Sequence, residues 1–380
     1  MQRPAPLDAG GSATASRSVV RVWDVGVRAF HWGLFAAVAV AALTGFVIGR
    51  TALAWHLAAG LMVTAAVAWR VVWGLLGPTY ARFGSFAYRP ADVVAHVRDM
   101  LAGRHRRYLG HNPLGAMMVF ALLGALTAIV LAGTLALGGM LKQGPLRAFL
   151  SYDTGRLALG VHKALAILLL VMVGAHLAGV AFESWRGREN LVGAMLHGDK
   201  PRDPPADSRT PVPARPRLAV AIVLAVLLAG GAGIAALADL PAAGVPPAAL
   251  DPIYAEQCGA CHLAFPPSLA PAATWDRILA DLQHHFGADA TLSAEQVAHL
   301  RGWLDASAAG HWDSLPSHLL RVPAADGSLR ITDTPGWRRM HRHIPPAVFA
   351  AKPVYRRSAC EACHEDAESG RFVPQRITMP

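Results

Sequence analysis

Five long apolar stretches constrain this chain most, because each is long enough to cross a lipid bilayer as a helix. A bilayer core of about 30 Å needs about 20 mostly apolar residues. With 16% charged residues and a mean hydropathy of +0.34, the composition favours several spans over one soluble core. We expect the third stretch to end at Gly138 and Gly139. The stretches cover residues 29–48, 53–76, 113–137, 158–183 and 218–238.

The lysines and arginines predict which way these spans run. Residues 1–239 hold 23 Lys and Arg against 11 Asp and Glu, whereas residues 240–380 hold 12 against 14. With a cytoplasmic N-terminus, 18 of the 23 lie in the tail and in the 70–112 and 185–217 connections. This is the positive-inside pattern, so it explains the excess positive charge without nucleic acid. We predict a multi-pass protein of the bacterial inner membrane, with the chain after residue 240 in the periplasm.

Four histidines lie in these spans, where an ionisable side chain is costly and by default functional. They are His31, His56, His162 and His176. His162 and His176 share one helix face about 21 Å apart, because 14 residues make nearly four turns. Antiparallel spans then pair His56 with His162 near the outer end and His31 with His176 near the inner end. Two facing imidazoles supply the axial ligands of a haem, so we predict two b-type haems.

The residues around these histidines are similar to a known family. Val22-Trp23-Asp24 and Arg28-Ala29-Phe30-His31-Trp32 resemble the opening of bacterial cytochrome b561 and of the b-type subunits of nickel–iron hydrogenases. Residues 80–83, 109–113 and 189–195 continue the likeness, which covers about 20–200. The resemblance implies a four-helix dihaem core, bis-histidine ligation at the four histidines and electron exchange with a quinone. No quinone-binding motif is evident in the sequence.

Three more histidines, His96, His105 and His111, lie among arginines in the connection that precedes the third stretch. We interpret this segment as a solvated amphipathic helix against anionic lipid. Proton exchange or quinone access is the alternative, and we assign these histidines no role.

All four cysteines belong to two copies of one pattern. The copies are Cys258-Gly-Ala-Cys261-His262 and Cys360-Glu-Ala-Cys363-His364. C-x-x-C-H is typical of covalent c-type haem attachment, with the histidine as proximal iron ligand. A zinc ribbon does not require a histidine after each pair, and a redox dithiol more naturally follows a strand. We therefore predict two c haems, on the side of the membrane where bacteria attach them.

The distal ligands of these haems are harder to choose. We expect amphipathic helices over 274–286 and 293–307, with His285 on an apolar face. Phe265-Pro266-Pro267, Trp275, His285-Phe286-Gly287 and the Trp337 to His341 run make 252–380 resemble the bacterial dihaem cytochrome c family. Carried over by position, the resemblance implies His285 and His341 as distal ligands of the first and second c haem. His284 and His343 are the first substitutes, and Met340 or Met379 would raise the reduction potential.

These observations predict an all-α membrane protein: a four-helix dihaem b bundle, a fifth transmembrane helix and a mostly α-helical extracytoplasmic dihaem cytochrome c domain. The expected parts are a cytoplasmic tail (1–20), a cytochrome b domain (21–200), a proline-rich cytoplasmic linker (201–216), the fifth helix (217–239) and the c domain (240–380).

The predicted function is respiratory electron transfer by a tetrahaem protein, between the quinone pool and a periplasmic haem protein or redox enzyme. No nucleophile, general base pair or phosphate loop is visible; the sequence leaves enzyme activity open, and a quinol:cytochrome oxidoreductase activity is compatible with this function. One alternative is a subunit that docks a periplasmic dehydrogenase or hydrogenase and delivers its electrons to quinone. Another is a haem oxidoreductase such as a superoxide oxidase, which needs a haem with a vacant axial position. The direction of electron flow stays open.

Overall fold

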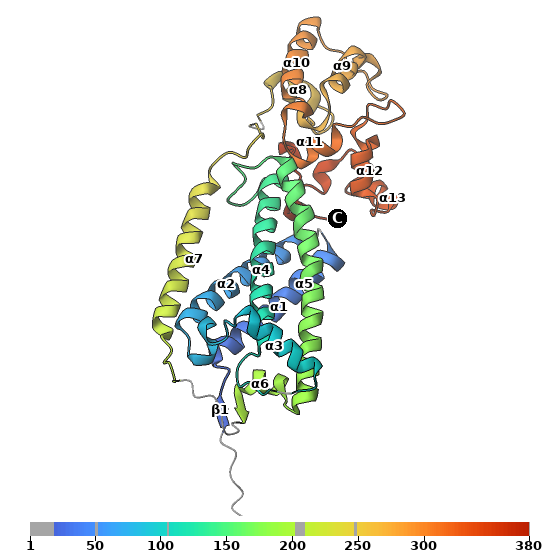
Figure 1. The fold of residues 1–380 in the computed structure, drawn as a ribbon. Helices are drawn as coiled ribbons and strands as arrows, with labels where there is room; N and C mark the ends of the chain where they lie inside the picture. Colours follow the sequence, from blue (N-terminus) through green and yellow to red (C-terminus); the bar gives the residue numbers. More distant parts are fainter. Residues whose placement is uncertain (1–18, 50–51, 105, 202–209, 247–248, 380) are drawn as a thin grey trace, which may run out of the picture. The chain divides into compact units, whose positions relative to one another are not determined.

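The computed structural model describes residues 19–49, 52–104, 106–201, 210–246 and 249–379 (Figure 1). Five of its helices are long and apolar enough to cross a membrane, and they coincide with the five predicted stretches. The all-α prediction is confirmed, and within the described ranges the strands form one two-stranded sheet. The long helices are α1 (Val25–Ala42, continued by a π-helix over Leu43–Ile48), α2 (Leu53–Leu76), α4 (Pro113–Met140), α5 (Tyr152–Gly187) and α7 (Pro216–Ala238).

Helix α4 does not end at Gly138 and Gly139 as expected, but continues to Met140. The two glycines serve packing instead. A Cβ atom at Gly139 would lie 2.6 Å from Cα of Gly155 in α5 and 2.6 Å from the carbonyl oxygen of Ser151. Small residues let two membrane helices approach backbone to backbone, so these glycines mark a close α4–α5 contact and not a helix end.

The chain forms two compact units, and the first lies within residues 1–35, 66–123 and 170–224. Strand β1 (Val19–Arg21) pairs antiparallel with β2 (Asp199–Pro201), with Val20 opposite Lys200. The backbone N–H of Trp23 also donates to Gly198. Val22, Trp23 and Trp73 form the centre of a buried apolar cluster. Two shorter helices complete this unit: α3 (Pro90–Leu101) and α6 (Leu191–His197).

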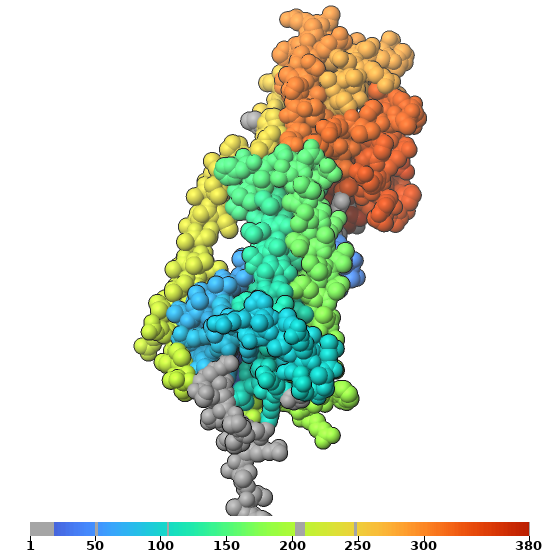
Figure 2. Space-filling view, in the orientation of Figure 1, coloured from blue at the N-terminus to red at the C-terminus, as the bar shows by residue number. Residues whose placement is uncertain are grey.

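The second unit lies within residues 36–65, 124–169 and 225–380. Its C-terminal part, 252–380, is a set of short helices whose starts are capped by side chains. Asp251 and Thr334 cap α8 and α12, and Ser293 forms a capping box with Gln296 in α10. Figure 2 shows this part packed in orange to red. The helices are α8 (Pro252–Gly259), α9 (Ala272–Ala280), α10 (Ala294–Ser307), α11 (Leu315–Leu320), α12 (Pro335–His341) and α13 (Pro346–Ala350).

Parts of the expected domain scheme lie outside the described residues. These are most of the tail (1–18) and part of the proline-rich linker (202–209).

Candidate functional site

The structure brings the eight histidines together in the four predicted pairs. Two imidazoles that share a metal ion through bonds of about 2.0 Å, with ring radii of about 1.1 Å, have ring centres about 6.2 Å apart. The observed separations are all within 0.2 Å of that value, so the residues present fit an iron ion held between two imidazoles. The ring-centre distances are 6.4 Å for His31–His176, 6.0 Å for His56–His162, 6.2 Å for His262–His285 and 6.2 Å for His341–His364.

Backbone carbonyls orient four of these rings through Nδ1. In the membrane helices, Nδ1 of His56 lies 3.1 Å from the oxygen of Ala41, and Nδ1 of His162 lies 2.9 Å from that of Ile129. An Nδ1–H that donates to a carbonyl leaves the lone pair on Nε2, the arrangement of most metal-bound histidines. Two rings of the C-terminal part have the same type of partner: His262 with Leu263 at 2.7 Å and His341 with Trp337 at 2.9 Å.

The surroundings of the His56–His162 pair contain residues that the sequence reasoning missed. The π-helix after α1 places the buried hydroxyl of Thr44 3.2 Å from Nδ1 of His56. Gly45 and Gly133 leave room for the rings, since a Cβ atom there would lie 3.3 Å and 3.1 Å from the respective imidazole. Glycine is otherwise unfavourable in the interior of a helix. The two glycines within apolar helices could therefore have indicated, from the sequence, that a bulky group lies close to the backbone there.

The route by which His285 reaches His262 differs from the prediction. Helix α9 ends at Ala280, so the expected helix over 274–286 is wrong over its last six residues and His285 is not on a helix face. Phe286 and Gly287 have φ values of +53° and +99°, in the left-handed region that reverses the chain. The reversal brings His285 opposite Ala288 in an antiparallel bridge, with its ring near-parallel to that of His262.

The second C-x-x-C-H motif has a helical partner. His341 ends α12, and its ring stacks on Trp337 with centroids 4.3 Å apart. The substitutes that the sequence left open are engaged elsewhere. His284 is bonded to Asp281 at 2.8 Å, and His343 accepts from Arg342 at 2.9 Å, both at the surface.

Burial adjusts the titratable groups of these two sites. It lowers the pKa of His285, His341 and His364, which keeps the imidazoles in the neutral form that can bind a metal. It also raises the pKa of the Cys258 thiol to about 11 and that of the Cys360 thiol to about 12. Burial therefore disfavours the thiolate form at both sulfur atoms.

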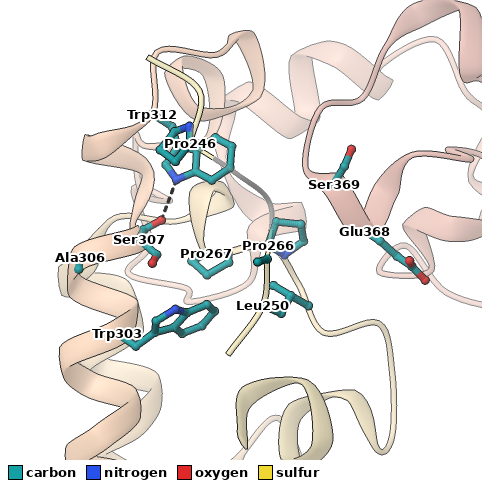
Figure 3. Close-up of a pocket in the computed structure, with 11 residues that line it drawn as sticks. Pro246, Leu250, Pro266, Pro267, Trp303, Ala306, Ser307, Trp312, Glu368 and Ser369 are labelled. Carbon is teal, nitrogen blue, oxygen red and sulfur yellow. Dashed lines mark hydrogen bonds between the residues drawn. The ribbon is translucent and has the colours of Figure 1, made fainter. Parts of the chain in front are cut away.

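The two cysteine pairs do not come together as a zinc ribbon would require. Among the described residues, which include all four cysteines, no group of three or more His, Cys, Asp or Glu side chains is placed to hold a metal ion. A cleft in the C-terminal part lies beside Pro266, Trp303 and Trp312 and includes none of the predicted ligands (Figure 3).

The interpretation of the arginine-rich connection as a solvated segment is wrong for two of its histidines. His96 is only 8% exposed. His111 packs edge-on against Trp23, with centroids 4.8 Å apart, and against Phe86 at 4.5 Å. Burial, together with the positive charge of Arg70, lowers the pKa of His111 to about 3, so it is neutral. His105 lies outside the described residues.

Comparison with known proteins divides the chain in the same way. Residues 22–198 match the family model of prokaryotic cytochrome b561, and residues 254–372 match that of dihaem cytochrome c. No curated protein matches the chain.

Three solved structures match the C-terminal part. The crystal structure of DHC purified from Rhodobacter sphaeroides is 34% identical, with 32% of this chain and 96% of that chain covered and a TM-score of 0.26. A diheme cytochrome c from the same organism is 33% identical, with 33% of this chain and 98% of that chain covered and a TM-score of 0.29. A diheme cytochrome type c from Shewanella baltica is 31% identical, with 34% of this chain and 92% of that chain covered and a TM-score of 0.28.

The matched families carry haem b and haem c and transfer electrons. Residues 254–372 therefore belong to the dihaem cytochrome c family, residues 22–198 match the family model of prokaryotic cytochrome b561, and the protein is a membrane-spanning, haem-containing electron-transfer protein.

Proposed function

We propose that this protein holds four haems and passes electrons between the quinone pool of the bacterial inner membrane and a periplasmic acceptor. The observation that carries the proposal is the set of four histidine pairs with ring centres 6.0–6.4 Å apart. In this proposal His31 with His176, and His56 with His162, hold two b haems. Two covalent c haems are held by Cys258, Cys261, His262 and His285, and by Cys360, Cys363, His364 and His341.

The bound haem supplies one-electron chemistry, and the side chains supply position, ligation and exclusion of water. Among the histidines of the long helices, His56 and His162 are pre-oriented by carbonyls of neighbouring helices, so this pair would hold a haem with little rearrangement. Each C-x-x-C-H histidine faces a second imidazole. This favours six-coordinate electron transfer over a haem oxidoreductase, which needs a vacant axial position.

The quinone and the orientation rest on other grounds. The match of residues 22–198 to the b561 family model supports exchange with quinone. The lysine and arginine distribution supports a cytoplasmic N-terminus and a periplasmic C-terminal part. The acceptor would be a soluble haem protein or redox enzyme of the periplasm.

Haem counting tests the ligation. We expect His31→Ala and His56→Ala each to lose one of two b haems in a pyridine haemochrome assay, while the two c haems remain. His197→Ala, an exposed histidine outside the pairs, is the matched control and should keep all four haems. Retention of both b haems in either pair variant would contradict the assignment.

The direction of electron flow is tested by titrating the protein anaerobically with duroquinol and then with dithionite while its absorption spectrum is recorded. Reduction of the b bands and then the c bands by duroquinol supports flow from quinone to the periplasm. Reduction of both only by dithionite would instead favour a subunit that receives electrons in the periplasm.

A further inference from the structure

One connection of the membrane helices is held tightly by the C-terminal part of the same compact unit. This is the α4–α5 connection, residues 141–151. Lys142 donates from Nζ to Asp313 at 2.8 Å, and the backbone N–H of Tyr152 donates to the same carboxylate oxygen at 2.8 Å. The other oxygen of Asp313 lies 2.9 Å from Nε2 of His318, whose ring stacks on Tyr152. The Lys142 side chain is only 7% exposed, so this is a built contact and not a surface ion pair.

A second link lies beside the first. Gln143 and Gln375 exchange two amide hydrogen bonds, of 3.2 Å and 3.1 Å. In Figure 2 the connection (green) meets the orange and red C-terminal part.

Both links lead to the second C-x-x-C-H site. Beside Gln375, Arg376 accepts from the N–H of Glu365 at 3.1 Å, and Thr378 donates to Cys363 at 2.8 Å. His364 and Ile377 form an antiparallel bridge. The segment that contacts Gln143 is therefore bonded to the residues that carry the proximal ligand.

The Asp313 link leads to the other ligand. His318 belongs to α11, which lies so close to α12 that a Cβ atom at Gly336 would collide with the backbone of Leu319. Helix α12 ends at His341, the partner of His364. Both imidazoles of the second site are thus joined to the α4–α5 connection, His364 through hydrogen bonds and His341 through hydrogen bonds followed by the packing of α11 on α12.

The same connection leads directly to the His56–His162 pair. Helix α5 begins at Tyr152, and His162 follows after a rise of about 15 Å along the helix. Helix α4, on the other side of the connection, supplies the Ile129 carbonyl that orients His162.

The first C-x-x-C-H site has different neighbours. Within the described residues, no hydrogen bond or ion pair joins 252–307 to the α4–α5 connection. The first site instead meets the second. A Cβ atom at Gly370 would lie 2.9 Å from Pro266 and from Ser268. Figure 3 shows Pro266 and Pro267, which follow the first motif, across the cleft from Glu368 and Ser369, which follow the second.

From these contacts we propose that the Cys360–His364 site, and not the Cys258–His262 site, exchanges electrons directly with the His56–His162 site. The order is then the His56–His162 site, the second c site, the first c site and the soluble partner, in either direction. Each step moves one electron from a reduced to an oxidised iron, with no bond formed or broken. The proposal rests on the haem ligation of the proposed function.

The test measures which c haem is magnetically coupled to the His56–His162 haem in the oxidised full-length protein. His341→Met and His285→Met first assign the two c signals, because a methionine ligand raises the potential of the haem that it binds. Each variant should shift one c potential upward and leave both b potentials unchanged. If neither variant shifts a potential, the assignment of His341 and His285 as haem ligands is wrong, and not only the proposed order of electron transfer.

Pulsed electron paramagnetic resonance then follows the spin relaxation of each c signal when one b haem is removed. His162→Ala should slow relaxation of the second c signal and leave the first unchanged, because the nearby paramagnetic iron is gone. His176→Ala, which removes the other b haem, is the matched control and should change neither signal. A change confined to the first c signal, or in neither signal, would overturn the proposed order. Should His162→Ala fail to fold, His56→Ala removes the same haem.

Discussion

Asp313 is the residue whose removal tests most directly how the C-terminal part is held on the α4–α5 connection. Its carboxylate accepts from Lys142 and from the N–H of Tyr152 and is bonded to His318, all at 2.8–2.9 Å. In Asp313→Ala, Lys142 keeps its bond to the carbonyl of Leu150 but loses its counter-ion, and its side chain is only 7% exposed.

The free-energy cost of Asp313→Ala follows from this burial. Removing one partner of a fully buried ion pair costs about 3–5 kcal/mol. Since the Asp313 side chain is 28% exposed, water screens part of the interaction, and we expect about 2–3 kcal/mol. At 1.36 kcal/mol per factor of ten, the open population of the contact should rise about 30- to 150-fold.

The assay is hydrogen exchange of the backbone amides in the α4–α5 connection and at Tyr152, in the full-length protein in detergent. Asp313→Ala should lower their protection by that factor. Asp326→Ala is the matched control, since Asp326 makes a local bond to the N–H of Ser328 in an exposed turn. The double variant Asp313→Ala with Lys142→Met should recover part of the protection, because no unpaired charge stays buried. Unchanged protection in Asp313→Ala, or no recovery in the double variant, would refute the reasoning.

Three further predictions concern the same unit. Burial opposes ionisation of Asp313, but its hydrogen bonds outweigh this effect and hold its pKa below the usual 3.8. The contact with Lys142 should therefore persist above that pH and open as the pH falls through the lowered pKa. Hydrogen exchange of the same amides, measured at a series of pH values, would show this opening. Gly139→Ala should cost about 1–3 kcal/mol or more, because its Cβ would lie 2.6 Å from Cα of Gly155, and a thermal melt followed at the b-haem band measures this loss. Thr44→Val removes one partner of Nδ1 of His56, which weakens the imidazole as a donor to ferric iron. One b potential should rise by tens of millivolts, on a scale of about 59 mV per tenfold change, and an unchanged redox titration would contradict this role.

The histidine pairs were accessible from the sequence because their information is local or periodic. Each C-x-x-C-H motif spans five residues. The pairing of His56 with His162 required only the helical period and the antiparallel direction of successive spans. The likeness to dihaem cytochromes c then selected His285 and His341 from several candidates, and the structure places both opposite the expected histidines.

Where the prediction went wrong, a contact or a backbone conformation overrode the local pattern. His285 was expected on a helix face, but the chain leaves the helix at Ala280 and turns through left-handed residues. His111 was expected in solvent because arginines surround it in sequence. Its side chain nevertheless packs on Trp23 and Phe86, which come from other segments.

The sequence by itself determined the membrane spans, the all-α class and the residues available for haem, because apolar length and ligand spacing are properties of continuous segments. Only the tertiary structure decided what joins those segments. Lys142 and Asp313 are 171 positions apart, and neither belongs to a motif. Folding removes water from a lysine on a helix connection and from an aspartate beside α11, and each then needs the other as a partner. No local sequence pattern indicates which distant residue replaces the lost water.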